Sequence, residues 1–179
     1  MLIDDVKEVL ISQEEITERC RQLGAEVSRD YEDKVPVIIG LLKGSIPFMA
    51  ELLKNITIDC ETEYMAVSSY SGTESMGDVK IVKDLDRSIV SRDVLVVEDI
   101  VDTGKTLEKV KELLHSKGAS SVKVIALLDK PSRRITDITA EYVGFTIPDK
   151  FVIGFGLDFN QKYRNLPFVG VLKEECYEG

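Results

Sequence analysis

Carboxylates and hydroxyl groups gather in one short stretch, directly after an apolar run. Glu98 and Asp99 follow the apolar residues 94–97, Asp102 comes three residues later, and residues 103–106 read Thr-Gly-Lys-Thr. An apolar run without polar alternation is typical of a parallel strand buried on both faces, and ligands of such sheets bind beyond the carboxyl ends of the strands. Acids followed by a turn rich in hydroxyl groups therefore predict a site for a sugar phosphate.

A helix is predicted directly after this turn. Leu107, Val110, Leu113 and Leu114 are spaced three or four residues apart, which favours an amphipathic helix, and Gly118 is a suitable residue at its C-terminal end. The N-terminus of such a helix offers free backbone N–H groups and the positive end of its dipole. We expect it to face a phosphate.

Two commoner phosphate motifs match less well. Residues 104–106 read Gly-Lys-Thr, like the end of a P-loop, but Asp99 stands where the first P-loop glycine belongs, and its carboxylate would repel a triphosphate. Gly154 and Gly156 begin a dinucleotide-binding pattern, but Phe159 stands where the third glycine belongs. Neither motif is predicted to operate here.

The pattern over residues 96–106 resembles a known family. It is similar to the phosphoribosyl pyrophosphate (PRPP) motif of the type I phosphoribosyltransferases, and four further segments stand in the order found in bacterial hypoxanthine phosphoribosyltransferases: residues 42–44, 68–70, 129–134 and 148–158. The resemblance covers about residues 3–172. It implies transfer of the 5-phosphoribosyl group from PRPP to hypoxanthine and guanine, giving IMP or GMP and pyrophosphate in purine salvage.

The resemblance also implies roles for the sugar-phosphate residues. Asp102 would be the general base that takes a proton from the purine, and Glu98 with Asp99 would contact the ribose hydroxyls directly or through Mg²⁺. Asp158 would bind a second Mg²⁺ on pyrophosphate. The other PRPP contacts implied by the resemblance are Lys43, Gly44, Ser69, Tyr70, Thr103, Gly104, Lys105, Thr106 and Arg164. The family's cis peptide before the lysine would fall between Leu42 and Lys43.

The purine base would be bound near Asp158 by Lys130, Phe151 and Val152. The Lys130 ammonium would donate to the 6-oxo group, Phe151 would stack on the ring, and the Val152 backbone would meet the N1 and N2 edge. Each assignment has a plainer alternative: Lys130 as a surface lysine, Phe151 and Val152 as core residues, and Asp102 as a helix N-cap.

Composition limits the class of protein. A chain of 179 residues with 44% hydrophobic content predicts one domain over residues 1–179, and a net charge of −9 disfavours nucleic acid as a partner. Three cysteines without metal-ligand spacing favour reduced thiols in a cytoplasmic protein. Neither a secretory signal nor a membrane span is apparent. The resemblance implies a homodimer or homotetramer.

Periodicity predicts an α/β fold, with a mostly parallel twisted sheet flanked by helices. Ser12 and Glu15 form a capping box ahead of a helix that ends near Asp30. The other elements expected before and after the phosphate helix are residues 35–42, 46–54, 61–69, 79–85, 122–128, 142–146 and 152–155. The core would span about residues 35–147. A small hood, implied by the resemblance, would combine N-terminal residues with about 149–172, and residues 71–78 would form a lid.

Two other functions remain open. One is a phosphoribosyltransferase for another base, such as xanthine, adenine or a pyrimidine. Lys130 and the Phe151–Val152 pair favour 6-oxopurines and leave both guanine and xanthine open. A regulator that binds PRPP or nucleotide without catalysis would be expected to have a basic surface and a degraded site, whereas this chain is acidic and keeps Asp102, Lys130 and Asp158. His115, the only histidine, falls on the predicted helix and is not expected to act in catalysis.

Overall fold

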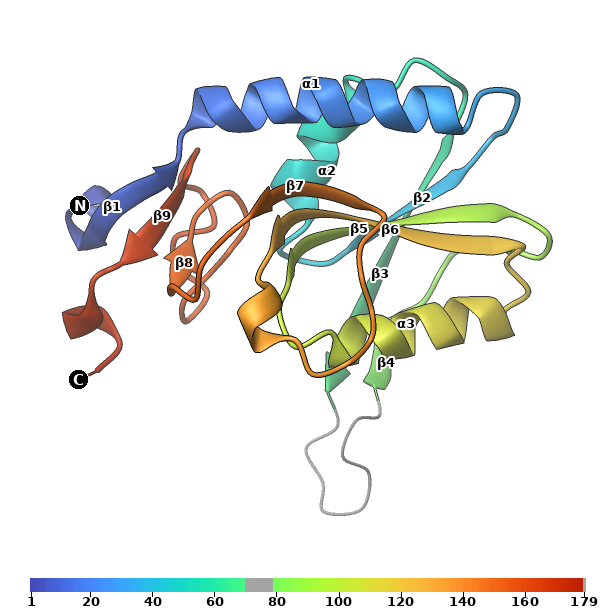
Figure 1. Cartoon of the computed structure of the whole chain (residues 1–179). Coiled ribbons are helices and arrows are strands. Elements are labelled where there is room, and N and C mark those ends of the chain that lie inside the picture. The colour runs from blue at the N-terminus through green and yellow to red at the C-terminus, as the bar shows by residue number, and fades with distance from the viewer. Residues whose placement is uncertain (70–78, 179) are drawn as a thin grey trace.

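A computed structural model describes residues 1–69 and 79–178. Its larger sheet has the strand order β4-β3-β2-β5-β6-β7, in which every neighbouring pair is parallel except β3 and β4 (Figure 1). The strands are β2 (Val37–Leu41), β3 (Glu61–Ser69), β4 (Val79–Lys83), β5 (Asp93–Val101), β6 (Ser121–Asp129) and β7 (Tyr142–Thr146). The predicted α/β class with a mostly parallel sheet is confirmed. The predicted lid at 71–78 and Tyr70 lie outside the described residues.

Helices cover both faces of this sheet (Figure 1). Helices α1 (Gln13–Asp30) and α2 (Ile46–Leu53) pack on the face that includes Leu95 and Val97, and α3 (Lys105–Ser116) packs on the face that includes Val94 and Val96. All four of these β5 side chains are 0% exposed. The unbroken apolar run is therefore a strand buried on both faces, as predicted.

The helix ends also follow the sequence signals. The Ser12 hydroxyl accepts the Glu15 N–H at 3.1 Å, and the Glu15 carboxylate accepts the Ser12 N–H at 2.7 Å, which completes the predicted capping box. Helix α3 ends at a Lys117 cap, followed by Gly118 with φ +94°. A left-handed residue after the cap is the usual helix ending.

A second, antiparallel sheet joins the two ends of the chain. It contains β1 (Val6–Ile11), β9 (Val169–Leu172) and β8 (Val152–Ile153), in the order β1-β9-β8 (Figure 1). The sequence pattern did not predict β1 or β9 as strands, because each is stabilised by a partner far along the chain. Strand β8 is also shorter than the predicted 152–155. In the part of the chain that the structure describes, there are also three short 3-10 helices: Leu2–Asp5, Pro131–Arg133 and Glu174–Cys176.

Strand β5 is longer than expected. It continues to Val101, so Glu98 and Asp99 lie in the last part of the strand, and Glu98 is paired with Ala126. The predicted position of the two acids at the carboxyl end of this strand is confirmed, and ladder pairing with β6 extends the strand past the apolar run. Strands β2 and β4 are slightly shorter than predicted.

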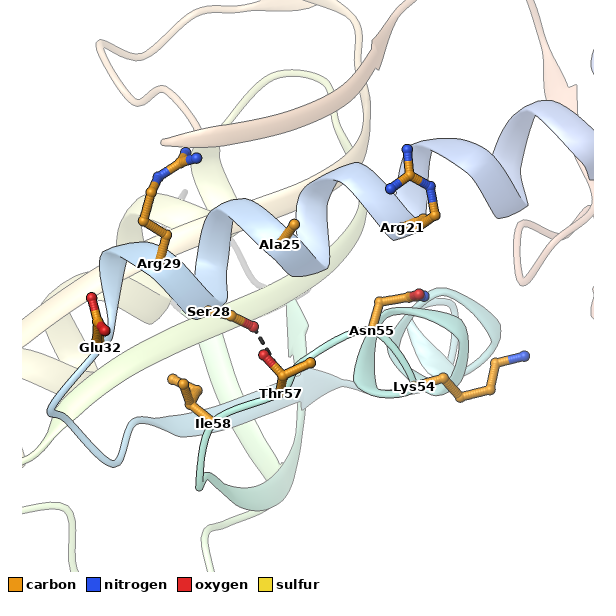
Figure 2. A pocket seen from close by; sticks show the side chains of 9 residues that line it. All are labelled: Arg21, Ala25, Ser28, Arg29, Glu32, Lys54, Asn55, Thr57 and Ile58. Carbon is orange, nitrogen blue, oxygen red and sulfur yellow. Dashed lines mark hydrogen bonds between the residues drawn. The ribbon is translucent and has the colours of Figure 1, made fainter.

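The close approach of α1 to the segment after α2 depends on Gly24. A Cβ atom built on Gly24 would lie 2.4 Å from the Asn55 Cβ and 2.5 Å from the Asn55 carbonyl oxygen. Next to this contact, the Ser28 hydroxyl donates to the Gly24 carbonyl at 2.7 Å. The same hydroxyl accepts the Thr57 N–H at 3.0 Å (Figure 2). The glycine therefore allows two backbones to pack directly.

Gly24→Ala should lower the free energy of unfolding by about 1–3 kcal/mol, because the added methyl group overpacks this contact. Helix propensity alone would predict that the free energy of unfolding rises by about 1 kcal/mol. Urea denaturation measures the difference. Ala25→Gly, at an exposed position of the same helix, should show the ordinary propensity cost. A more stable Gly24→Ala variant would mean that Asn55 moves away freely.

A cavity of about 590 Å³ also lies between α1 and this segment (Figure 2). Its lining residues are Arg21, Ala25, Ser28, Arg29, Glu32, Lys54, Asn55, Thr57 and Ile58. None of them belongs to the predicted site. The three cationic side chains that line it are paired with neighbouring acids: Arg21 with Glu18, Arg29 with Asp30, and Lys54 with Glu51.

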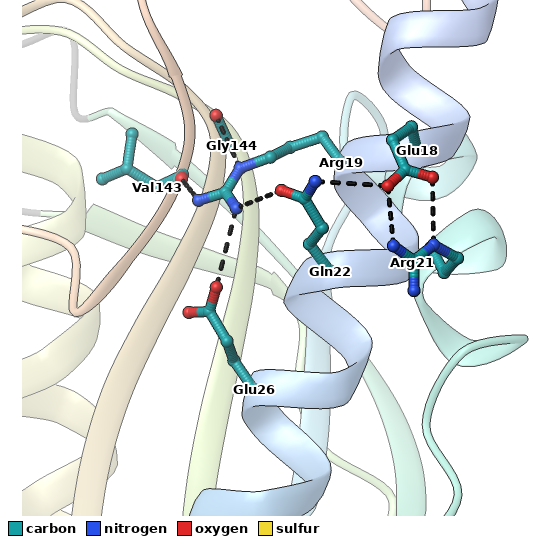
Figure 3. A network of polar contacts seen from close by, with 7 residues as sticks. All are labelled: Glu18, Arg19, Arg21, Gln22, Glu26, Val143 and Gly144. Carbon is teal, nitrogen blue, oxygen red and sulfur yellow. Dashed lines mark hydrogen bonds and ion pairs between the residues drawn. The ribbon is translucent and has the colours of Figure 1, made fainter.

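Arg19 attaches α1 to the edge strand β7 (Figure 3). Its guanidinium donates to the Val143 carbonyl at 2.7 Å and to the Gly144 carbonyl at 2.9 Å, with Gln22 and Glu26 beside it. These bonds connect α1 to the main chain of β7 at two consecutive carbonyls. Among the described residues, no helix is long and apolar enough to cross a membrane.

Candidate active site

The carboxyl ends of the central strands bring the predicted site residues to one edge of the sheet. Gly40 of β2 is opposite Val97 of β5, and Val101 of β5 is opposite Asp129 of β6. The segments that follow β2, β5 and β6 therefore start side by side. They contain Lys43 and Gly44, the 102–106 turn, and Lys130.

Gly44 is packed against two distant segments. A Cβ atom on Gly44 would lie 1.8 Å from the Asp99 Oδ2, and one on Gly156 would lie 2.0 Å from the Gly44 carbonyl oxygen. The Leu42–Lys43 peptide beside it is cis, as the resemblance implied. The segment after β2, the end of β5 and the 154–157 turn thus meet at a contact that only glycine permits.

Arg164 and Asp158 lie beside this contact. One Arg164 nitrogen donates to the Gly156 carbonyl at 2.6 Å, and another pairs with Asp158 at 3.4 Å. Its Nε is buried without a hydrogen-bond partner among the described residues. The structure therefore brings Gly44, Asp158 and Arg164, predicted for the pyrophosphate side, together with Asp99, predicted to contact the ribose hydroxyls directly or through Mg²⁺.

The surroundings of Glu98 and Asp99 disfavour the ionised form of both carboxylates. Burial, and then the neighbouring Asp99 charge, raise the pKa of Glu98 well above its usual value. Burial also raises the pKa of Asp99, although hydrogen bonding and the Arg164 charge act in the opposite direction. Two half-buried adjacent carboxylates disfavour their own ionisation, so a cation or hydroxyl donors at this position would be bound favourably.

Glu98→Gln should raise the free energy of unfolding at pH 7–8. Since the folded-state pKa of Glu98 lies above its unfolded value, its stability contribution is intact below the unfolded pKa and is lost as pH rises through the folded pKa. Glutamine does not ionise, so the Glu98→Gln variant does not lose this stability as pH rises. Its Tm should exceed that of the wild type by several degrees near neutrality and converge with it below about pH 4.

The control for this experiment is Glu112→Gln on α3, where the carboxylate is 60% exposed and paired with Lys109. Its Tm should follow the wild-type pH profile. A Glu98→Gln variant that is less stable than wild type at pH 8 would show that the Glu98 charge is compensated in the folded protein.

The 102–106 turn has a geometry that differs from an ordinary helix cap. Gly104 is the N-cap residue of α3, with φ 84° and no side-chain cap bond, and the Asp102 carboxylate accepts the Thr103 N–H at 2.7 Å. The alternative that Asp102 is the N-cap of this helix is wrong. Asp102, Lys105 and Thr106 are exposed.

The Lys130 side chain is held by polar contacts directly after β6. Its ammonium donates to the Lys150 carbonyl at 2.8 Å, lies 3.8 Å from Asp149, and belongs to a side chain that is only 12% exposed. The alternative of an ordinary surface lysine is wrong. The bond to Lys150 places this ammonium next to Phe151 and Val152, the other residues predicted to contact the base.

Phe151 and Val152 differ in exposure. The Phe151 ring is 38% exposed, stacks on Tyr177 with centroids 4.8 Å apart, and contacts Phe159 edge to face at 5.5 Å. The alternative of a core residue is wrong for Phe151, whereas the Val152 side chain is buried at 8% exposure. The backbone role predicted for Val152 does not depend on its side chain.

The remaining residues considered from the sequence are His115, the three cysteines and Ser69. His115 is exposed on α3, and Cys20, Cys60 and Cys176 are free thiols. Burial raises the pKa of Cys20 to about 12, so this thiol is not a nucleophile near neutrality. Ser69 is exposed at the end of β3.

Sequence reasoning missed two residues beneath the phosphate turn, Asp129 and Arg134. They pair closely with each other, and Arg134 also donates to the Asp102 carbonyl at 3.0 Å. The available signal was the basic run after β6, in which two arginines follow Lys130 within four residues.

The carboxylates present suit Mg²⁺ that arrives with a ligand. In the described ranges, 1–69 and 79–178, no group of three or more His, Cys, Asp or Glu residues could hold a metal ion. Mg²⁺ commonly uses one or two carboxylates together with substrate oxygens and water. The adjacent pair Glu98 and Asp99 meets that requirement, and Asp158 offers a separate carboxylate.

Comparison with known proteins agrees with this geometry. A family model described as a phosphoribosyl transferase domain matches residues 11–160. The chain belongs to the phosphoribosyltransferase family. The matched range contains the phosphate turn, Lys130 and Asp158.

Individual relatives place the chain within one branch of the phosphoribosyltransferases. It is 51% identical to the hypoxanthine-guanine phosphoribosyltransferase of Bacillus subtilis (strain 168) over 99% of both chains. A crystal structure of a hypoxanthine phosphoribosyltransferase from Staphylococcus aureus is similar with a TM-score of 0.96 and 50% identity, over 99% of this chain and 97% of that one. A solved hypoxanthine-guanine-xanthine phosphoribosyltransferase has a TM-score of 0.87 and 41% identity, over 96% and 99%. The predicted resemblance to the bacterial hypoxanthine-guanine enzymes of this type I family is confirmed.

Proposed function

We propose that this chain transfers the 5-phosphoribosyl group of PRPP to hypoxanthine and guanine, with release of pyrophosphate, in purine salvage. The observation that carries the proposal is the meeting of three sets of residues at one sheet edge: the 102–106 turn, Lys130 beside Phe151, and Gly44 with Asp99 and Arg164. They match the three parts of the reacting complex, namely the 5′-phosphate, the base and the pyrophosphate. The relatives named above support the same activity.

In this proposal the phosphate turn holds the sugar by its 5′-phosphate. The backbone N–H groups at the start of α3 and the hydroxyls of Thr103 and Thr106 bind the phosphate oxygens, with Gly104 and Lys105 contributing mainly through their backbone. Asp102, exposed at the mouth of the turn, takes the proton that the purine loses. Holding both reactants in line supplies much of the rate enhancement.

The pyrophosphate and base are bound on either side of this centre. Lys43, Gly44, Ser69 and Arg164 bind pyrophosphate oxygens in the proposal, and Tyr70, outside the described residues, is assigned the same role. A planar guanidinium is well suited to phosphate oxygens. Lys130 donates to the 6-oxo group, Phe151 stacks on the ring, and the Val152 backbone meets its edge.

Mg²⁺ is proposed at two positions, one near Glu98 and Asp99 and one near Asp158. When bound, it would neutralise charge on the leaving pyrophosphate. Glu98 and Asp99 orient the ribose hydroxyls, and the raised pKa values of this pair favour a site that is filled by cation and substrate together.

We further propose that residues 1–179 act as one domain, with a core of about 35–147 and a hood from the N-terminal residues and about 149–172. We propose a cytoplasmic location, which suits this chemistry and the three free thiols. A homodimer or homotetramer is proposed from the resemblance, with no nucleic-acid or membrane partner.

A panel of bases tests the function. Hypoxanthine, guanine, xanthine, adenine and uracil are each supplied with PRPP and Mg²⁺, and nucleotide formation is followed by chromatography. The proposal predicts the highest kcat/KM for hypoxanthine or guanine. A preference for xanthine would support the alternative suggested by the hypoxanthine-guanine-xanthine relative, and PRPP binding without any nucleotide product would indicate a regulator.

Lys130→Ala should reduce the preference for hypoxanthine over adenine by about 10- to 100-fold, the effect of one charged hydrogen bond to the base. The ratio of the two kcat/KM values measures it. Lys34→Ala is the control, because Lys34 pairs with Asp93 at the opposite end of β5. An unchanged ratio would remove Lys130 from base selection.

A further inference from the structure

A single arginine ties the phosphate turn to the strand beside it. Arg134 Nε donates to the Asp102 carbonyl at 3.0 Å, and Nη1 donates to the Ile138 carbonyl at 2.8 Å. Its Nη2 forms a close ion pair with the Asp129 carboxylate at the end of β6. The Arg134 side chain is 14% exposed, so its three nitrogens satisfy three separate acceptors in a partly buried position.

The residues around Arg134 contact the same turn one carbonyl after another. The Lys130 N–H donates to the Val101 carbonyl at 2.9 Å, and the Ile135 N–H donates to the Thr103 carbonyl at 3.1 Å. Together with Arg134, they occupy the carbonyls of residues 101, 102 and 103 in order. The 130–138 segment is therefore a continuous support for the main chain of the turn.

The 134–138 segment also packs tightly against Gly104 of the turn. A Cβ atom on Gly104 would lie 2.4 Å from the Thr136 Oγ1, 2.5 Å from the Ile138 Cγ2 and 3.1 Å from the Arg134 Cδ. Gly104 has φ 84°, a conformation that suits glycine, so the turn is pressed against the 134–138 segment at the point where α3 begins. Movement of that segment would move the turn.

We propose that Arg134 is a positioning residue, which acts through the main chain of the phosphate turn to set the Asp102 carboxylate and the N–H groups that bind the 5′-phosphate. This inference rests on the function proposed above. The Asp102 carboxylate is exposed and accepts the N–H of the next residue, so its location follows the course of its own backbone. The Arg134 guanidinium holds that backbone through its hydrogen bond to the Asp102 carbonyl.

The shape of the side chain matters as well as its charge. The acceptors of Arg134 lie on three segments, and a planar guanidinium reaches them with nitrogens at fixed angles, whereas a lysine ammonium is a single point of charge. Arg134→Lys keeps the charge beside Asp129 but cannot keep all three bonds. Arg134→Gln removes the charge and leaves Asp129 partly buried without its partner.

The test compares Arg134→Lys and Arg134→Gln with Arg133→Gln. Arg133 is the neighbouring arginine; its side chain is 61% exposed and pairs with Asp149 at 3.0 Å. For each variant, calorimetry measures the binding of ribose 5-phosphate and of pyrophosphate, steady-state assays give kcat and KM, and thermal unfolding gives Tm.

Both Arg134 variants should weaken ribose 5-phosphate binding about tenfold and lower kcat about 10- to 100-fold, the cost of a small misplacement of reacting groups. Pyrophosphate binding and the KM for the base should stay within about twofold of wild type. Arg133→Gln should match wild type in all five quantities: both binding affinities, kcat, KM and Tm.

Equal weakening of all ligands in proportion to a fall in Tm would show a purely structural role, and unchanged ribose 5-phosphate binding would show no role; either would overturn the proposal. Should Arg134→Gln fail to fold, Arg134→Lys decides by the same criteria. If wild type made no nucleotide from any base, the proposed function would fail, whereas the difference between the two binding measurements would still test Arg134.

Discussion

Replacing Asp102 by asparagine should lower kcat by about 10²–10⁴-fold, the usual contribution of a general base, while the affinity for PRPP stays within about twofold. Asparagine keeps the size of the side chain and an oxygen that can accept the Thr103 N–H, a bond of 2.7 Å in the structure. It cannot take a proton. Because Gly104 is the N-cap of α3, the substitution should leave that helix unchanged.

The measurement is a steady-state assay with hypoxanthine and guanine, together with PRPP binding by calorimetry and Tm by thermal unfolding. Asp59→Asn makes the same chemical change at an exposed position before β3, at the end of the sheet away from the site. It should retain wild-type kcat. A parallel loss of PRPP affinity and Tm in Asp102→Asn would mean that Asp102 organises the turn instead of accepting a proton.

Removal of Mg²⁺ by a chelator should reduce turnover by about 10³-fold or more, because a divalent cation at a leaving group contributes several kcal/mol. The described carboxylates supply at most an adjacent pair and one separate group, which is a small share of the six ligands that Mg²⁺ takes. We therefore expect the ion to be bound chiefly through PRPP or pyrophosphate oxygens.

Calorimetry separates these contributions. Mg²⁺ added to the protein alone should bind weakly, whereas Mg²⁺ added with pyrophosphate should bind strongly, and activity should return when Mg²⁺ is restored in excess of chelator. Asp158→Asn should weaken binding of the Mg²⁺-pyrophosphate pair without changing ribose 5-phosphate affinity. Turnover that persists in chelator would contradict the metal role proposed for Asp158 and for the Glu98–Asp99 pair.

Local patterns predicted the main elements well, since they report burial and capping directly. The apolar run 94–97 identified the central strand, the spacing of Leu107, Val110 and Leu114 identified α3, and Ser12 with Glu15 identified the start of α1. These signals depend on neighbours within a few residues, so tertiary packing had little to add.

The same approach did not find β1 and β9, whose bonding is to each other across most of the chain. It also did not show that pairing with β6 extends β5 past the apolar run and through both acids to Val101. In each case the decisive partner lies far away in sequence. Short or polar strands of this kind have little local periodicity to reveal them.

Local sequence patterns specify the class of the sheet, the order of its strands along the chain, the acids near the end of the central strand and the hydroxyls that follow it. Only the tertiary structure decided that Gly44 meets Gly156, that Lys130 is held beside Phe151, and that Arg134 supports the main chain of Asp102. The difference arises from how far apart along the chain the interacting residues lie. Periodicity and caps are set by residues within a turn or two, whereas these contacts require segments far apart in the chain to pack together, which no local pattern specifies.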